Sequence, residues 1–285
     1  MDVFYIISNQ IKKSAQTNAD FIKKYLEGNG KICYVDSSAA TEPAGPYRYT
    51  DAKKMPDNVE CVIALGGDGT LLQASRDLVG TGLPLLGINL GTLGYLAEIE
   101  QKGILPALER LISGEYTIEE RMMLNGEVEQ DGGPVRSDIA LNDIVLTRRG
   151  KFRVMDFNIY VDDVFLCSYR ADGIILSTPT GSTGYSLSAG GPIVSPDASL
   201  ILLTAVAPHT LNSRTIVLPD HVTVSVEAAG RDDGAEGSAN VLFDGDTEIS
   251  LSRGHRVRVT RSEQTTRLIK IRHTSFVENL REKLK

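Results

Sequence analysis

The chain of 285 residues has only three cysteines, Cys33, Cys61 and Cys167. Their number is odd and each falls in an apolar, strand-like run, which favours reduced thiols over disulfides. There is no Cys-x-x-Cys pair and no paired Cys/His spacing of the kind that binds zinc. We therefore expect a cytoplasmic protein without a zinc site of its own.

Long apolar runs and an excess of basic residues are also absent. No apolar stretch is long enough to span a membrane, and the N-terminal run Val3–Ile7 turns polar too early for a signal peptide. The formal net charge is -7, which makes the chain a poor non-specific binder of nucleic acid. We expect neither a membrane nor a nucleic-acid partner, and an anionic ligand would need a local positive potential.

The first 114 residues alternate between strand-like and helix-like patterns. Short apolar runs predict strands, and apolar residues at helical spacing predict helices, the last of them closed by Gly114. This alternation predicts an α/β domain with a parallel, doubly wound sheet. Residues 36–58 are rich in Ser, Ala, Pro and Gly and are expected to form a long surface loop. The expected strands are 3–7, 31–35, 61–65 and 84–89, and the expected helices are 14–27, about 70–79 and 104–112.

The pattern changes after about residue 115, where short strand-like runs alternate with turns. Val222–Glu227 shows a clean period of two, with one face buried and one exposed. The sequence therefore predicts an all-β second domain. The last ten residues, 276–285, predict an amphipathic helix that docks on the first domain through Phe276, Val277 and Leu280. The expected strands are 138–147, 153–161, 164–169, 173–178, 200–206, 214–218, 222–228, 247–251, 255–260 and 267–272.

A glycine-rich turn with one carboxylate, Gly66-Gly67-Asp68-Gly69-Thr70, follows the buried run that begins at Cys61. The glycines let a ligand approach the backbone, and the N–H groups at the start of the next helix form an anion site. A carboxylate there can take a proton from an attacking hydroxyl or help to hold magnesium. The spacing fits neither the Walker A motif nor the Rossmann fingerprint. An ordinary turn from strand to helix, with Asp68 as a cap, is the alternative.

A second polar stretch follows the buried run 172–177 and extends from Thr178 to Pro192. Its hydroxyl groups and backbone amides suit a polar, planar ligand, and Tyr185 offers a stacking face. The alternative is an ordinary Ser/Thr/Gly loop. Phe243-Asp244-Gly245-Asp246 has the pattern of a hairpin turn between strands.

These motifs, together with Gly87-Ile88-Asn89-Leu90-Gly91-Thr92-Leu93-Gly94, resemble the bacterial NAD kinases over most of the chain. The block Thr178-Pro179-Thr180-Gly181-Ser182-Thr183 carries the resemblance most specifically, because other kinases share the first loop. The resemblance implies an α/β domain, 1–114, joined by the terminal helix, 274–285, and a β-rich NAD-binding domain, 115–273, with the active site between them. It also implies transfer of the ATP γ-phosphate to the 2′-hydroxyl of the adenosine ribose of NAD, a divalent metal, expected to be Mg²⁺, and a homodimer or homotetramer.

The resemblance assigns roles residue by residue. Asp68 would be the base, and Asp172 would face the nicotinamide. Asp143 stands where the family has Glu, and Gly184 stands where it often has Ala. Arg170 is a site candidate because it directly precedes Ala171-Asp172-Gly173. The phosphates would be cradled by Gly66, Gly67, Gly69 and Thr70, the dinucleotide bound by Asn142 and Asp143, and the adenosine contacted by Thr180, Ser182, Thr183 and Tyr185.

Two other functions stay open at this point. A lipid-type kinase would share the Gly-Gly-Asp-Gly loop but would need an apolar substrate groove, which the polar 178–192 stretch does not suit. A non-catalytic dinucleotide-binding sensor could dispense with Asp68, which is present.

Overall fold

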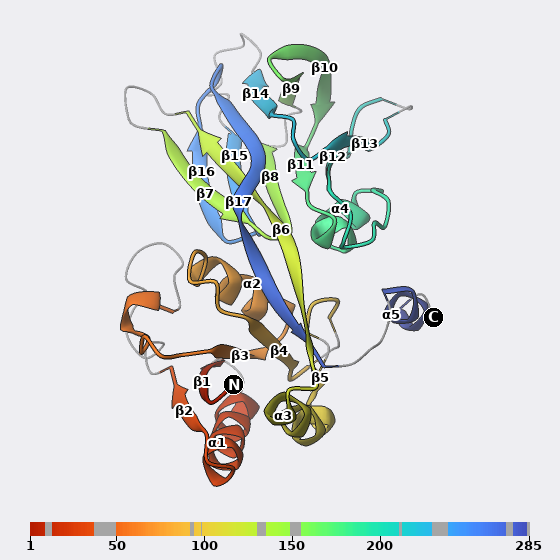
Figure 1. Ribbon diagram of the computed structural model, residues 1–285. Coiled ribbons are helices and arrows are strands. Elements are labelled where there is room, and N and C mark those ends of the chain that lie inside the picture. Colours follow the sequence, from red (N-terminus) through yellow and green to blue (C-terminus); the bar gives the residue numbers. More distant parts are fainter. Residues whose placement is uncertain are drawn as a thin grey trace. The chain divides into compact units, whose positions relative to one another are not determined.

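The computed structural model of the chain divides into two compact units (Figure 1). Unit 1 comprises Met1–Arg121 and Thr265–Lys285, and unit 2 comprises Met122–Gln264. Most of the predicted loop 36–58 and the motif residues Thr92 and Leu93 lie outside the described residues. The structure describes residues 1–8, 13–36, 50–91, 94–97, 99–129, 135–148, 155–210, 213–229, 239–271 and 276–283.

Unit 1 is built on a parallel sheet, which confirms the predicted α/β fold. The strand order is β2 (Ile32–Val35), β1 (Val3–Ser8), β3 (Cys61–Gly66) and β4 (Leu85–Asn89), with the short β5 (Ile99–Glu100) beside β4. The chain leaves β1 for β2 on one side and returns to β3 on the other. The strand order therefore reverses between β1 and β3, which is where open parallel sheets bind ligands.

Three helices cover this sheet. Figure 1 shows α1 (Lys13–Gly28) and α3 (Ile104–Ser113) on one side of the strands and α2 (Asp68–Asp77) on the other. The apolar residues of α1 and α3 share one buried cluster with the strands, including Ile22, Leu108 and Ile63. Gly114 ends α3 in the left-handed conformation, with φ +80°, as the sequence predicts.

Unit 2 is β-rich, which confirms the predicted β-rich second domain, and its strands form two sheets packed as a sandwich. One sheet has the order β13-β12-β11-β8-β15-β16, and the other contains β10-β9-β14 followed by the long strand β17 (Arg256–Lys270). Both sheets contribute to a single buried cluster, exemplified by Phe243 and Leu176 from one sheet and Phe157 and Val226 from the other. The strands are β7 (Arg136–Ala140), β8 (Asp143–Arg148), β9 (Met155–Val161), β10 (Val164–Ala171), β11 (Gly173–Ser177), β12 (Leu200–Val206), β13 (Ile216–Pro219), β14 (Val224–Ala229), β15 (Ala239–Phe243) and β16 (Thr247–Leu251).

Two long strands, β6 (Thr117–Val128) and β17 (Arg256–Lys270), begin in one unit and end in the other. The sequence predicted β17 as two separate strands and did not predict β6 or β15. The predicted strand 138–147 is in fact β7 and β8, separated by Leu141 and Asn142.

The C-terminal helix α5 spans Phe276–Lys283. The expectation that Val277 is buried in a docking face is wrong, because its side chain is 69% exposed. Among the described residues, no helix is long and apolar enough to cross a membrane.

Candidate functional site

The loop after β3 leads directly into the N-terminus of α2. A Cβ at Gly66 would lie 2.0 Å from the hydroxyl oxygen of Thr70, so the fold itself requires glycine there. A Cβ at Gly67 or at Gly69 would meet nothing within 4 Å. These two glycines therefore leave open space beside the first N–H groups of a helix, a place that suits an anion.

Asp68 is the first residue of α2, and its carboxylate reaches the second glycine-bearing loop. Its Oδ2 accepts from the amide of Tyr95 at 2.6 Å, and its Oδ1 accepts from the amides of Leu96 at 3.2 Å and Ala97 at 3.0 Å. A Cβ at Gly94 would lie 1.9 Å from Oδ1, so this contact depends on glycine. A carboxylate has about four acceptor sites. Three are filled by contacts with described residues, which leaves one acceptor site on Oδ2.

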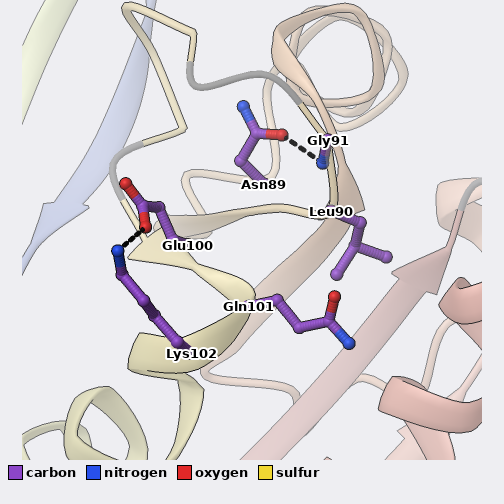
Figure 2. A pocket seen from close by; sticks show the side chains of 6 residues that line it. All are labelled: Asn89, Leu90, Gly91, Glu100, Gln101 and Lys102. Carbon is purple, nitrogen blue, oxygen red and sulfur yellow. Dashed lines mark hydrogen bonds and ion pairs between the residues drawn. The ribbon is translucent and has the colours of Figure 1, made fainter.

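A pocket of about 590 Å³ lies at the carboxyl ends of β4 and β5 in unit 1 (Figure 2). Asn89 is 2% exposed, and its Oδ1 accepts from the amide of Gly91 at 2.8 Å. The amide of Leu90 donates to the carbonyl oxygen of Gly66 at 2.8 Å, so the pocket adjoins the glycine loop. Sequence reasoning gave Asn89 no role, although a polar residue directly after a buried strand was a usable signal. The lining residues are Asn89, Leu90, Gly91, Glu100, Gln101 and Lys102.

Unit 2 holds a second pocket, of about 420 Å³, beside the corner that joins β7 to β8. The predicted site residues Asn142, Asp143 and Tyr185 line it together. Tyr185 is 46% exposed and begins the short helix α4 (Tyr185–Ser188), so its ring is accessible for stacking. The lining residues are Asn142, Asp143, Val145, Thr147, Tyr185, Leu242, Asp244 and Gly245.

Two buried polar atoms near this corner have no hydrogen-bond partner within the described part of the chain: Oδ1 of Asn142 and Oγ1 of Thr180. Gly181 packs so closely on Asn142 that a Cβ would lie 2.1 Å from the Asn142 carbonyl oxygen. Buried polar groups are normally hydrogen-bonded, so such atoms suit a polar ligand.

Asp143 is only 6% exposed, and its position makes ionisation costly. Burial and the neighbouring Asp244 carboxylate raise its pKa to about 7. Asp143 can therefore be neutral or charged near neutral pH, and it can donate or accept a hydrogen bond accordingly.

Asp244 is a residue whose role sequence reasoning missed. Its carboxylate accepts from three consecutive amides, those of Leu141 at 2.8 Å, Asn142 at 2.8 Å and Asp143 at 3.1 Å. The predicted hairpin turn is present between β15 and β16, with Asp244 at φ +51°. The turn thus also holds the β7–β8 corner, which lies about a hundred positions earlier in the chain.

The remaining predicted residues make contacts within the protein. The Ser182 hydroxyl accepts from the Val194 amide at 3.1 Å, and the Thr183 hydroxyl donates to the Thr180 carbonyl at 3.4 Å. Both hydroxyls therefore help to hold the loop that carries Thr180.

Arg170 and Asp172 are not among the residues that line the second pocket. Arg170 pairs with Asp156 at 2.9 Å, and its side chain is 47% exposed. Asp172 pairs with Arg148 at 2.9 Å. The structure thus gathers Asn142, Asp143 and Tyr185, with Thr180 beside them, but leaves Arg170 and Asp172 in separate ion pairs.

A parallel α/β unit with a glycine loop at its switch point, followed by a unit whose largely apolar pocket carries a few polar side chains, is typical of a nucleotide-binding protein. Family models are more specific. The ATP-NAD kinase N-terminal domain matches residues 4–116, and the ATP-NAD kinase C-terminal domain matches residues 122–271. The chain belongs to the ATP-NAD kinase family, which confirms the resemblance.

Full-length relatives are similar throughout. The chain is 41% identical to the NAD kinase of Lachnospira eligens over 100% of both chains, and 40% identical to that of Lachnoclostridium phytofermentans over 99% of both. Two solved structures share the fold at 24% identity. They are yeast NADH kinase complexed with NADH, with a TM-score of 0.87 over 100% of this chain and 87% of that one, and an Archaeoglobus fulgidus NAD kinase in complex with ATP, with a TM-score of 0.72 over 95% and 94%.

Proposed function

We propose that this protein is an NAD kinase, which transfers the γ-phosphate of ATP to the 2′-hydroxyl of the adenosine ribose of NAD and releases ADP and NADP. Family membership over both units supports the reaction. The observation that carries the mechanism is the placement of Asp68. Its carboxylate is fixed by three backbone amides and retains one acceptor site on Oδ2.

In this proposal, Asp68 accepts the proton of the attacking 2′-hydroxyl as the new oxygen–phosphorus bond forms. The bond between the γ-phosphorus and the bridging oxygen of ATP breaks, and ADP leaves with that electron pair. Phosphoryl transfer depends mostly on positioning and charge stabilisation. A base that is already held in place adds a factor of about 10²–10⁴.

Unit 1 supplies the phosphate-binding groups. The open spaces beside Gly67 and Gly69 give the ATP phosphates access to the first amides of α2, and Thr70 belongs to the same turn. Gly66 is assigned a structural part in this cradle, because its missing side chain makes room for Thr70. The pocket at Asn89 adjoins the loop and is our candidate for another part of the donor nucleotide.

Unit 2 supplies the groups for NAD. Asn142 and Asp143 bind the dinucleotide, Tyr185 stacks on a ring, and Thr180 offers a hydroxyl oxygen with no protein partner in the described residues. Ser182 and Thr183 fix the loop that presents Thr180. Asp172 remains a candidate for the nicotinamide end, and Arg170 remains a candidate for the binding site.

A divalent metal fits this chain as part of the ATP substrate. Within the described ranges, no group of three or more His, Cys, Asp or Glu side chains could hold a metal. Mg²⁺ commonly binds through substrate phosphates with only one or two protein carboxylates, so MgATP needs no such cluster. We propose MgATP as the donor, with the metal neutralising phosphate charge.

Three further expectations belong to this proposal. The domain boundaries stay at 1–114 with 274–285 for the nucleotide-binding part and 115–273 for the NAD-binding part. The protein acts as a homodimer or homotetramer. Its three cysteines are free thiols, which suits the cytoplasm.

A coupled assay for NADP formation tests the function. Purified protein is given NAD or NADH, with MgATP or polyphosphate, in all four combinations. The proposal requires NADP from NAD and MgATP, with equal amounts of ADP. Binding of NAD without any NADP formation would instead favour a dinucleotide-binding sensor, and turnover of a lipid but not of NAD would favour a lipid-type kinase.

A further inference from the structure

The carboxylate of Asp244 ties together two segments of unit 2 that are distant in sequence. β7 ends at Ala140 and β8 begins at Asp143, so the amides at this corner need acceptors from outside the strand ladders. Oδ2 of Asp244 accepts a hydrogen bond from the Leu141 amide, and Oδ1 accepts from the amides of Asn142 and Asp143. The link is reciprocal, because the Asp244 amide donates to the Asp143 carbonyl at 3.0 Å.

The same corner is held from its other side by Thr178. The Thr178 hydroxyl donates to the Leu141 carbonyl at 2.6 Å, and its amide donates to the Asn142 carbonyl at 2.9 Å. The corner is thus clamped between two loops, and its side chains Asn142 and Asp143 face the pocket that Asp244 also lines. A shift of Asp244 would change the direction of both side chains.

We propose that Asp244 is a positioning residue for the dinucleotide, which fixes the direction of Asn142 and Asp143 and sets the charge of Asp143 through its own negative charge. This inference rests on the proposed function of the pocket.

The groups that surround Asp143 explain how Asp244 influences its charge. Asp244 on the β15–β16 turn and Tyr185 on α4 are the titratable groups that share its pocket. From β11, its register partner is Ser177, whose hydroxyl donates to the Thr178 carbonyl. Asp246, on the same turn as Asp244, is not one of the lining residues. Among the described residues that line this pocket, Asp244 therefore presents the one negative charge beside Asp143, and it adds to burial in raising the pKa of Asp143 to about 7.

Asp244→Asn is the main test. An amide side chain has one acceptor oxygen instead of two, so at least one corner amide would face an NH₂ group. Asparagine tolerates the positive φ of this position, so the fold of the turn should survive. We expect the KM for NAD to rise about tenfold. The kcat and the KM for ATP should stay within about twofold.

Asp163→Asn is the matched control. Asp163 also occupies a hairpin turn of unit 2 at positive φ, +63°, but it is exposed and lies outside the pocket. This variant should bind NAD as the wild type does.

A pH profile separates positioning from a merely structural role. Calorimetric affinity for NAD between pH 5 and 9 should show a titration near pH 7 in the wild type, which Asp143→Asn should abolish. In Asp244→Asn the midpoint should move to lower pH, because a negative charge beside Asp143 is gone. In Asp244→Glu the charge remains but the arm is longer, so the KM for NAD should rise while the midpoint stays.

Two results would overturn the inference in different ways. An active wild type whose Asp244→Asn variant keeps both its KM for NAD and its pH midpoint would leave the proposed function standing and reject the positioning role. A wild type that neither binds NAD nor forms NADP would reject the function and the inference together.

Discussion

Replacing Asp143 with asparagine tests how strongly the fold resists a charge at this buried position. The variant keeps the size of the side chain and removes its ionisation. In the wild type, the pKa of Asp143 rises from the ordinary value of 3.8 to about 7, with burial as the first cause and Asp244 as the second. Because the folded state holds this proton more tightly than the unfolded state, folding takes up a proton between these two values.

The direction of the pH effect follows from that uptake. Below about pH 4 the Asp143 carboxyl group is protonated and does not lower the free energy of unfolding. That free energy falls as the pH rises from there through about 7, because folding must then take up a proton. The pKa shift from 3.8 to about 7 is a little over three tenfold steps, so at about 1.36 kcal/mol for each step the full loss is about 4 kcal/mol. Local relaxation lowers this upper limit. We therefore expect the free energy of unfolding of Asp143→Asn to increase, relative to that of the wild type, by about 2–4 kcal/mol as the pH is raised from 4 to 8.

Urea unfolding of both proteins, followed by circular dichroism at several pH values, measures this difference. The two units can unfold in separate steps, so the transition of unit 2 should be resolved before free energies are compared. A stability difference that stays constant from pH 4 to pH 8 would refute the reasoning, because it would mean that the folded protein ionises Asp143 without a penalty.

Three further substitutions test the loops and the terminal helix. Gly67→Ala places a Cβ in open space, so melting should be unchanged, whereas the KM for MgATP should rise at least about tenfold if phosphates occupy that space. Gly94→Ala forces a Cβ against the Asp68 carboxylate, and kcat should fall at least about 100-fold in a protein whose circular dichroism spectrum is unchanged. Val277→Ser alters an exposed side chain, so the Tm should stay within about 1–2 °C of the wild type; a larger fall would indicate that α5 packs against a partner.

The pattern of apolar runs was enough to predict the parallel sheet of unit 1 and the β character of unit 2. Strands of unit 1 such as β3 and β4 are buried on both faces and read as continuous apolar runs, whereas strands of unit 2 such as β16 bury one face and alternate. The polar triplet Ser262-Glu263-Gln264 interrupts the apolar pattern of β17, so the sequence predicted two strands where the structure has one. The environment of such a strand differs between the two units. The local hydrophobic pattern therefore does not reveal the full length of the strand. The charged start of β6, Glu119-Glu120-Arg121, hid that strand for the same reason.

The candidate site could also be predicted only in part from the sequence. The glycine loop and the polar stretch after buried strands marked Asp68 and Tyr185, since these features are local in sequence. Asn142 was marked only by the resemblance to a known family. The partners of the two key carboxylates are not local: Asp68 binds amides 27–29 residues away, and Asp244 binds amides 101–103 residues away. A hairpin-turn pattern gives no sign that its aspartate also holds another corner of the sandwich.

The single-turnover rate of NADP formation by Asp68→Asn is the most direct test of the proposed base. The asparagine keeps an acceptor oxygen of similar size but cannot take the proton of the 2′-hydroxyl. With NAD and MgATP bound, the account predicts a rate lower by about 10²–10⁴-fold, equivalent to about 2.7–5.4 kcal/mol of barrier. Calorimetry should show NAD binding that is retained or modestly weaker. If NAD binding collapses while the rate in the bound state is retained, Asp68 is a binding residue; if both match the wild type, Asp68 serves only to anchor the loop, and the account is contradicted.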